Sequence, residues 1–145
     1  MPRILVIDDE GAIRATLKSA LDKRGHETVT ASTARQGMEF ASAGFDVIFL
    51  DIMLPDKSGM EILPDLLAKY PQTAIVLISG HADIDTAVKA IRMGAYDFIE
   101  KPLSLDRILV TVDNAGTASR LRTENVRLSQ IVYGEIIGNH RQSGP

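Results

Sequence analysis

The sequence predicts an α/β protein with a doubly wound, five-stranded parallel sheet and a helical extension at the C-terminal side. Five short apolar runs alternate with amphipathic segments; the runs are rich in Val and Ile, and most of them show no alternation with polar residues. Continuous apolar runs of this kind are typical of strands buried on both faces. Helical crossovers between such strands place helices on both sides of a parallel sheet.

The five expected strands are four or five residues long and end in polar or turn residues. They are Ile4–Ile7, Thr28–Ala31, Val47–Leu50, Ala74–Ile78 and Ala95–Ile99. In open parallel sheets, chemistry takes place beyond the carboxyl ends of the strands. The residues that follow each run are therefore the first candidates for function.

Helical spacing separates the first three strands. The stripe of the first helix, over residues 12–24, consists of Ile13, Leu17, Ala20 and Leu21. Gly25 follows where a C-terminal cap belongs. Thr33 is expected to cap the second helix, in which Gly37 is a weak point.

The remaining helices follow the third, fourth and fifth strands. The third has its stripe at Met60, Leu63, Leu66 and Leu67, and the fourth at Ile84, Val88, Ile91 and Met93. Pro64 is expected near the first turn of its helix, where a missing N–H is tolerated. Gly94 ends the fourth helix, and the fifth begins at Ser104 or Leu105.

Composition narrows the class of protein. The chain has 145 residues, which suits one domain with a short appendage, and a net charge of −3, which disfavours a strongly basic nucleic-acid binder. The absence of cysteine excludes disulfides, thiolate metal sites and a cysteine nucleophile. The first apolar run is cut short by three acidic residues, so we expect no signal peptide, no membrane span and a cytoplasmic location.

Charge divides the chain into two parts. Residues 1–116 carry 12 basic and 17 acidic side chains, whereas residues 117–145 carry four basic and two acidic ones. The hydrophobic pattern changes at about the same place. We therefore expect a globular domain over residues 1–117, a helical linker or coiled coil over 118–133, and the start of a downstream module or a tail over 134–145.

Chemically useful side chains follow four of the five strands. Asp8 and Asp9 follow the first strand, Asp51 the third, Ser79 the fourth and Lys101 the fifth. Two unit charges about 4 Å apart interact by roughly 4 kcal/mol at an effective dielectric constant near 20. Three carboxylates and one ammonium therefore require either a proton or a bound cation. An all-oxygen ligand set favours Mg²⁺ or Mn²⁺.

Asp51 is the expected reacting group. It ends the central strand, and the loop over residues 52–58 can leave it open to a phosphoryl donor. Attack of its carboxylate on phosphorus would form an aspartyl phosphate, with Lys101 and Ser79 holding phosphoryl oxygens. Each residue also has a simpler interpretation: the acidic run 8–10 could cap a helix, and Asp51 could begin a turn. Their coincidence at one edge of the sheet favours a site.

These motifs resemble the receiver domain of bacterial two-component response regulators over about residues 1–117. The matching segments are Ile4-Leu5-Val6-Ile7-Asp8-Asp9-Glu10, Leu50-Asp51-Ile52-Met53-Leu54-Pro55, Ser79-Gly80 and Glu100-Lys101-Pro102. The segment 85–102 is similar to the NtrC-type branch. Members of that branch join a receiver to an AAA+ ATPase and a DNA-binding helix-turn-helix.

The resemblance implies a flavodoxin-like strand order of 2-1-3-4-5 and a role for each residue of the site. Asp51 would accept a phosphoryl group from a cognate sensor histidine kinase. Asp9, Asp51 and the Met53 backbone carbonyl would bind Mg²⁺, with Asp8 acting mainly through a water. Lys101 and Ser79 would bind the phosphoryl group. The Lys101–Pro102 peptide is often cis in this family.

Three further positions acquire roles from the resemblance. Phe98 matches an aromatic switch that turns inward when Ser79 moves toward the phosphate, although periodicity alone favours plain core packing on the fifth strand. Met53 and His81 occupy positions that tune the lifetime of the phosphoryl group. Neither side chain offers a carboxylate or an amide to orient water, so we expect slow self-dephosphorylation.

The C-terminal extension allows a weak heptad pattern with Asn125 at an a position, a common register-setting device in two-stranded coils. We expect a homodimer that uses helix four, strand five, helix five and this linker; a solvated helix that frays is the alternative. Residues 133–139 resemble the entry to the AAA+ module. Residues 140–145 fit either native chain or vector sequence, and we expect no direct contact with nucleic acid or membrane.

The sequence therefore predicts a phosphorylation-controlled switch rather than a turnover enzyme. A Mg²⁺-dependent phosphohydrolase acting through an aspartyl phosphate is the alternative. Such enzymes usually carry an Asp-x-Asp pair, and here Ile52 and Met53 follow Asp51, which removes the general acid. A binding module that has lost phosphorylation is a third possibility, which the complete acidic set disfavours.

Overall fold

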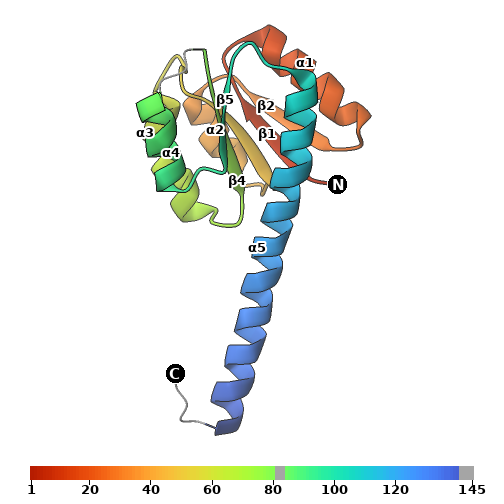
Figure 1. Ribbon diagram of the computed structural model, residues 1–145, viewed down its shortest axis with the longest axis vertical. Coiled ribbons are helices and arrows are strands. Elements are labelled where there is room, and N and C mark those ends of the chain that lie inside the picture. Colours follow the sequence, from red (N-terminus) through yellow and green to blue (C-terminus); the bar gives the residue numbers. More distant parts are fainter. Residues whose placement is uncertain (81–83, 141–145) are drawn as a thin grey trace.

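The computed structural model describes residues 1–80 and 84–140, with side chains described as far as residue 124. Strands and helices alternate along the chain (Figure 1). The elements are β1 (Arg3–Ile7), α1 (Gly11–Lys23), β2 (Glu27–Ala31), α2 (Ala34–Ala41), β3 (Val47–Asp51), α3 (Gly59–Lys69), β4 (Ala74–Ser79), α4 (Ile84–Met93), β5 (Asp97–Glu100) and α5 (Leu105–His140). The five predicted strands and five predicted helices are all present.

The sheet has the order β2-β1-β3-β4-β5, and every pair of neighbours is parallel. The expected strand order is thereby confirmed. In the register, Ile7 lies opposite Ala31 and Leu50, and Asp51 lies opposite Ile78. The carboxyl ends of β1, β3, β4 and β5 therefore meet at one edge.

Helices cover both faces of the sheet and bury separate halves of the core (Figure 1). Helices α2, α3 and α4 pack on the face that contains Leu5, Ile48 and Leu77. Helices α1 and α5 pack on the opposite face, which contains Val6 and Phe49. Burial on both faces explains why most of the strands, β2 excepted, lack polar alternation.

Local signals place most element ends correctly. Thr33 caps α2 through its side-chain oxygen, which accepts the Gln36 N–H, and Gly25 and Gly94 adopt positive φ values of 89° and 122° after their helices. Two expectations were wrong. Strand β5 begins at Asp97, so Ala95 belongs to the preceding turn. Pro64 is the sixth residue of α3 rather than part of its first turn, so the helix forgoes an internal hydrogen bond there.

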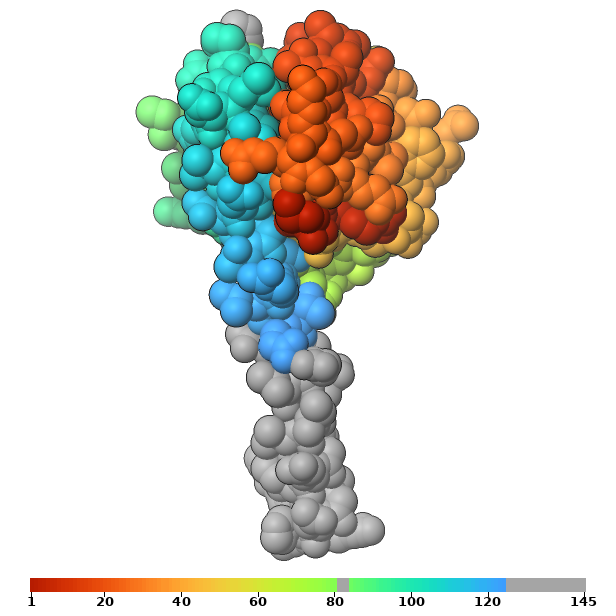
Figure 2. Space-filling model, turned by 90° about the vertical axis from the view of Figure 1, so that its right-hand side faces the viewer, coloured from red at the N-terminus to blue at the C-terminus, as the bar shows by residue number. Residues whose placement is uncertain are grey.

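Helix α5 leaves the sheet as one continuous helix (Figure 1). A Cβ on Gly116 would lie 2.6 Å from Pro2 Cγ, so the glycine allows the N-terminus to pack against the helix. Figure 2 shows the N-terminal residues, in dark red, beside the blue part of α5 at the base of the domain. Ser119, which is buried, donates a 2.6 Å hydrogen bond from Oγ to the Gln72 carbonyl. The packed part of α5 thus extends at least to Ser119.

The expected division at residue 117 stays a prediction, as does the identity of residues 134–145. Asn125 lies outside the described side chains, and residues 141–145 lie outside the described structure. Within the described part of the chain, no helix is both long enough and apolar enough to cross a membrane.

Candidate functional site

Four strands deliver the candidate residues to one edge of the sheet. Asp51 and Ser79 are the last residues of β3 and β4, whereas Asp8 and Lys101 directly follow β1 and β5. The Lys101 ammonium lies 3.1 Å from Asp51 Oδ2 and 3.3 Å from Asp8 Oδ2. Side chains separated by up to 93 positions in the sequence therefore meet around the Lys101 ammonium.

Asp51 is held on both of its carboxylate oxygens. Oδ1 accepts a 3.0 Å hydrogen bond from the Met53 N–H, and Oδ2 accepts one from Lys101. The residue is only 1% exposed, so the loop that follows it does not leave it open as expected from the sequence. Gly59 is needed beneath it, because a Cβ there would lie 2.3 Å from the Asp51 carbonyl oxygen.

The acidic run after β1 surrounds the same lysine. Asp8 is fully buried; its Oδ1 accepts the Glu10 N–H at 2.8 Å, while among the described residues Oδ2 has no hydrogen-bond donor. Its 3.3 Å separation from the Lys101 ammonium is an ion pair without hydrogen-bond geometry. Glu10 Oε1 accepts a 2.8 Å bond from Lys101, and Arg14 donates to the Asp8 carbonyl at 2.8 Å.

Burial and charge act against each other at these groups. Burial raises the pKa of Asp51 to about 6, and the negative charge of Asp8 adds to this, whereas the Met53 N–H and Lys101 oppose it. Burial alone would lower the pKa of Lys101, but hydrogen bonds to Glu10 and Asp51 and the nearby charges raise it above its ordinary value. Lys101 therefore remains a cation at neutral pH.

The donor set suits a hard divalent cation. Carboxylate oxygens of Asp8, Asp9 and Glu10 lie within 4.8 Å of one another. Around Lys101, the carboxylates of Asp8, Glu10 and Asp51 exceed the single positive charge by two. An excess of negative charge, oxygen donors only and a buried Asp8 oxygen without a hydrogen bond are the conditions that Mg²⁺ or Mn²⁺ satisfies.

The remaining predicted residues have different surroundings. Ser79 is buried, and its carbonyl accepts the Lys101 N–H at 2.7 Å. Phe98 on β5 is half-buried and packs against the core formed with α2, α3 and α4. The Lys101–Pro102 peptide is cis. The Met53 side chain is 70% exposed, and His81 lies outside the described residues.

Two residues that contribute to the site or to the loop beside it were not identified from the sequence. Glu10 was considered only as part of a cap, yet it makes the shortest ion pair of Lys101. Its position next to two aspartates was the available signal. Asp56, in the loop after β3, accepts hydrogen bonds from the Ala34 and Arg35 N–H groups of α2 at 2.8 and 2.9 Å. No local pattern predicts a contact across 21 residues.

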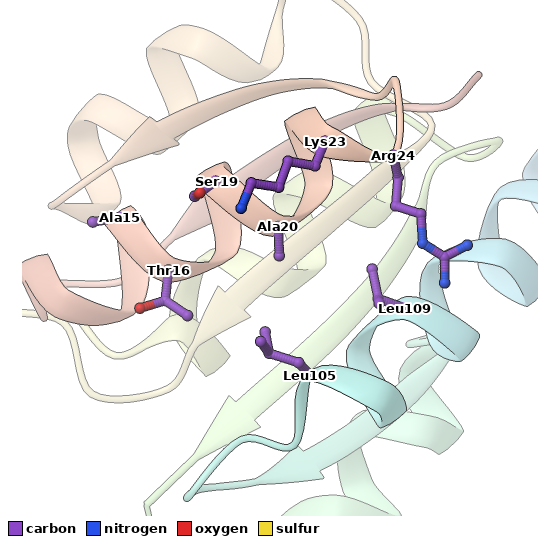
Figure 3. Close-up of a pocket in the computed structure, with 8 residues that line it drawn as sticks. All are labelled: Ala15, Thr16, Ser19, Ala20, Lys23, Arg24, Leu105 and Leu109. Carbon is purple, nitrogen blue, oxygen red and sulfur yellow. The ribbon is translucent and has the colours of Figure 1, made fainter.

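A groove lies between α1 and the start of α5 (Figures 2 and 3). Its volume is about 620 Å³, and it is lined by Ala15, Thr16, Ser19, Ala20, Lys23, Arg24, Leu105 and Leu109. Thr16 and Leu105 also border a second hollow that reaches Glu10, Lys101 and Pro102. Small side chains on α1 keep this face hollow beside the site.

Comparisons with known proteins agree with this geometry. The family profile for the response regulator receiver domain matches residues 4–113. The chain is 40% identical over 131 residues to the nitrogen assimilation regulatory protein NtrX of Azorhizobium caulinodans. The aligned region covers 88% of this chain and 29% of that protein. The chain thus corresponds to about three tenths of this curated relative.

Solved receiver domains have the same fold. The crystal structure of the receiver domain of NtrX from Brucella abortus aligns with a TM-score of 0.73 and 41% identity, covering 79% of this chain and 98% of that one. The solution structure of the beryllofluoride-activated NtrC4 receiver domain dimer aligns with a TM-score of 0.76 and 38% identity, covering 81% and 98%. The protein therefore belongs to the response regulator receiver domain family, in its NtrC-type branch.

Proposed function

We propose that the protein is a phosphorylation-dependent signalling switch in which Asp51 accepts a phosphoryl group from a sensor histidine kinase. The observation that carries this proposal is the pairing of Asp51, buried at the end of the central strand, with the Lys101 ammonium at 3.1 Å inside an acidic cluster. A carboxylate next to a fixed cation and a cation-binding cluster suits phosphoryl transfer, which depends on positioning and charge neutralisation.

The chemistry assigned to Asp51 is a simple displacement. An oxygen of its carboxylate forms a bond to phosphorus while the P–N bond of a phosphohistidine breaks, and the imidazole nitrogen keeps the electron pair of that bond. With a pKa of about 6, roughly nine-tenths of Asp51 is ionised and nucleophilic at pH 7. Lys101 and the Ser79 hydroxyl would then bind oxygens of the transferred group.

Asp9, Asp51 and the Met53 carbonyl would hold Mg²⁺, and Asp8 would act through a bound water. When bound, the ion offsets the charge shared by the carboxylates and the phosphoryl oxygens. The buried Asp8 oxygen without a hydrogen bond and the spacing of the acidic run support this assignment. Met53 is the second residue after Asp51, and its exposed, apolar side chain supports slow self-dephosphorylation.

The response would be a shift between two conformations that already coexist. Movement of Ser79 toward the phosphoryl group would open space for Phe98, which the structure holds half-buried on β5. Phe98 packs on the same face of the sheet as α4, whose exposed side chains include Ile84, Val88 and Ile91. The switch would thereby reach an apolar surface that is available for assembly.

We further propose that this surface, α5 and the linker form a homodimer, and that its rearrangement controls a downstream ATPase and DNA-binding output. The exposed apolar side chains Val110 and Leu121 on α5 support the participation of that helix. A role alongside a histidine kinase places the protein in the cytoplasm, in keeping with a chain free of cysteine. Among the residues that the structure describes at the site, none supplies the general acid that the phosphohydrolase alternative needs two positions after Asp51.

Labelling with acetyl phosphate and Mg²⁺ tests the proposal. We expect stoichiometric, acid- and base-labile incorporation in the unaltered chain and none in Asp51→Asn. Asp65→Asn, which neutralises an exposed aspartate on α3, is the matched control and should label normally. Full labelling of Asp51→Asn would exclude Asp51 as the phosphoacceptor.

A further inference from the structure

We propose that Asp56 is a positioning residue that fixes the loop carrying the Met53 carbonyl, and through it the proposed Mg²⁺ site. This inference rests on the proposed function, since it gives the loop's geometry a role in cation binding. Asp56 itself is exposed and lies outside the cluster around Lys101. It would act only by holding the loop over residues 52–58 in place.

The loop is fixed at its base by backbone contacts. Met53 and Ser58 form an isolated antiparallel bridge, and the Gly59 N–H donates a 2.7 Å bond to the Ile52 carbonyl. The Ser58 hydroxyl oxygen also accepts the Met60 N–H at 3.1 Å, which begins α3 directly after the loop. These contacts close the loop but do not attach its tip to the rest of the domain.

Asp56 supplies that attachment. Its Oδ1 accepts the Ala34 N–H at 2.8 Å, and its Oδ2 accepts the Arg35 N–H at 2.9 Å. Both donors belong to the first turn of α2, where backbone N–H groups have no partner within the helix. Two short bonds to one carboxylate fix its orientation as well as its distance.

The turn that receives Asp56 is also connected to the acidic run. Strand β2 ends at Ala31, three residues before α2 begins, and the Ala31 carbonyl accepts the Asp8 N–H at 3.0 Å. The short segment from Ala31 to Arg35 is thus bonded to Asp8 at one end and to Asp56 at the other. It connects the acidic run with the loop that carries the Met53 carbonyl. Loss of the Asp56 contact would leave the Met53 carbonyl free to move relative to Asp8.

Asp56 could act only as a cap of α2 and have no effect on the loop over residues 52–58. A variant at Thr33 separates the capping role from the loop-fixing role. Thr33 caps the same helix end, because its Oγ1 accepts the Gln36 N–H at 3.0 Å. Thr33→Ala therefore weakens the start of α2 without releasing the loop. Asp56→Ala weakens the same helix end and releases the loop as well.

The experiment measures Mg²⁺ binding by titration calorimetry and amide hydrogen exchange of Gly59 in the cation-free protein. We expect Asp56→Ala to weaken binding by about tenfold, as loss of a residue that orients a metal ligand does. It should also speed Gly59 exchange, whereas Thr33→Ala leaves both within about twofold of the unaltered chain. Asp56→Asn keeps one acceptor oxygen and should give intermediate values, and it serves if Asp56→Ala does not fold.

Each result decides between separate claims. Equal effects of Asp56→Ala and Thr33→Ala, or unchanged binding and exchange in Asp56→Ala, would overturn the positioning role and leave the proposed function intact. Absence of Mg²⁺ binding by the unaltered chain would overturn the proposed cation site itself, and the positioning role with it.

Discussion

Replacing the Asp51 carboxylate by an uncharged amide should stabilise the cation-free protein at neutral pH. Burial raises the pKa of Asp51 from 3.8 to about 6, so the folded state holds its proton more tightly than the unfolded chain does. The favourable contribution of the protonated form is complete below pH 3.8 and is lost as the pH rises through 6. Asp51→Asn retains an uncharged side chain of similar size at every pH.

The magnitude follows from the difference between the two pKa values. Each tenfold difference in proton affinity is worth about 1.4 kcal/mol, so the ionised carboxylate lowers the free energy of unfolding by up to about 3 kcal/mol at pH 7. The same treatment gives about 1.6 kcal/mol at pH 5 and about 0.6 kcal/mol at pH 4. Lys101 keeps Glu10 and Asp8 as partners in the variant, so its charge stays compensated.

Urea unfolding followed by far-ultraviolet circular dichroism measures this difference, since the chain has no tryptophan. In the presence of chelator, the increase in the free energy of unfolding caused by Asp51→Asn should become larger from pH 4 to pH 7. It should shrink or reverse at millimolar Mg²⁺, because a cation that binds only the folded state stabilises the unaltered chain more. A gain in stability that does not vary with pH, or a variant less stable than the unaltered chain at pH 7 in chelator, would refute this reasoning.

Asp56→Asn is the control with the opposite sign. Backbone N–H groups of Arg35 and Ala34 lower the pKa of Asp56, so its ionised form is favoured in the folded state. Its contribution is present above the unfolded pKa and is lost as the pH falls through the folded one. The variant should therefore lose stability at pH 7, and the loss should diminish as the pH falls below 3.8.

Three further predictions concern single contacts. Gly59→Ala places a Cβ 2.3 Å from the Asp51 carbonyl oxygen, so urea unfolding should show a loss of about 2 kcal/mol or more; a neutral effect would mean that α3 can shift freely. Ser119→Ala removes the bond to the Gln72 carbonyl and should cost about 1 kcal/mol in the same assay, and no change would indicate that α5 is not anchored there. Met53→Asn offers an amide beside the phosphoryl group and should shorten its lifetime in an acid-quench assay; an equal or longer lifetime would remove the assigned role of this position.

The sequence was sufficient for the layers of the fold because its signals are local. Unbroken apolar runs predicted buried strands, and Gly25 and Thr33 marked ends that the structure confirms. The expected position of Pro64 was wrong because α3 already begins at Gly59, where the Ser58 side chain caps it by accepting the Met60 N–H. Ala95 was placed in a strand because it is apolar, whereas it is buried in the turn before β5.

The composition of the site was predictable and its internal contacts were not. The rule about strand ends identified Asp8, Asp51, Ser79 and Lys101 without any distance. The burial of Asp51 and the pairing of Glu10 with Lys101 depend on how loops fold over the sheet edge. Periodicity carries no information about such long-range contacts.

Chemical mapping of the phosphoryl group tests the central claim most directly. The chain is treated with acetyl phosphate and Mg²⁺, reduced with borohydride so that an aspartyl phosphate becomes homoserine, and digested for mass spectrometry. We predict homoserine at position 51 only, dependent on both the donor and Mg²⁺. Homoserine at Asp8 or Asp9 instead, or none at any position in a folded chain that binds Mg²⁺, would contradict the assignment of Asp51 as the phosphoacceptor.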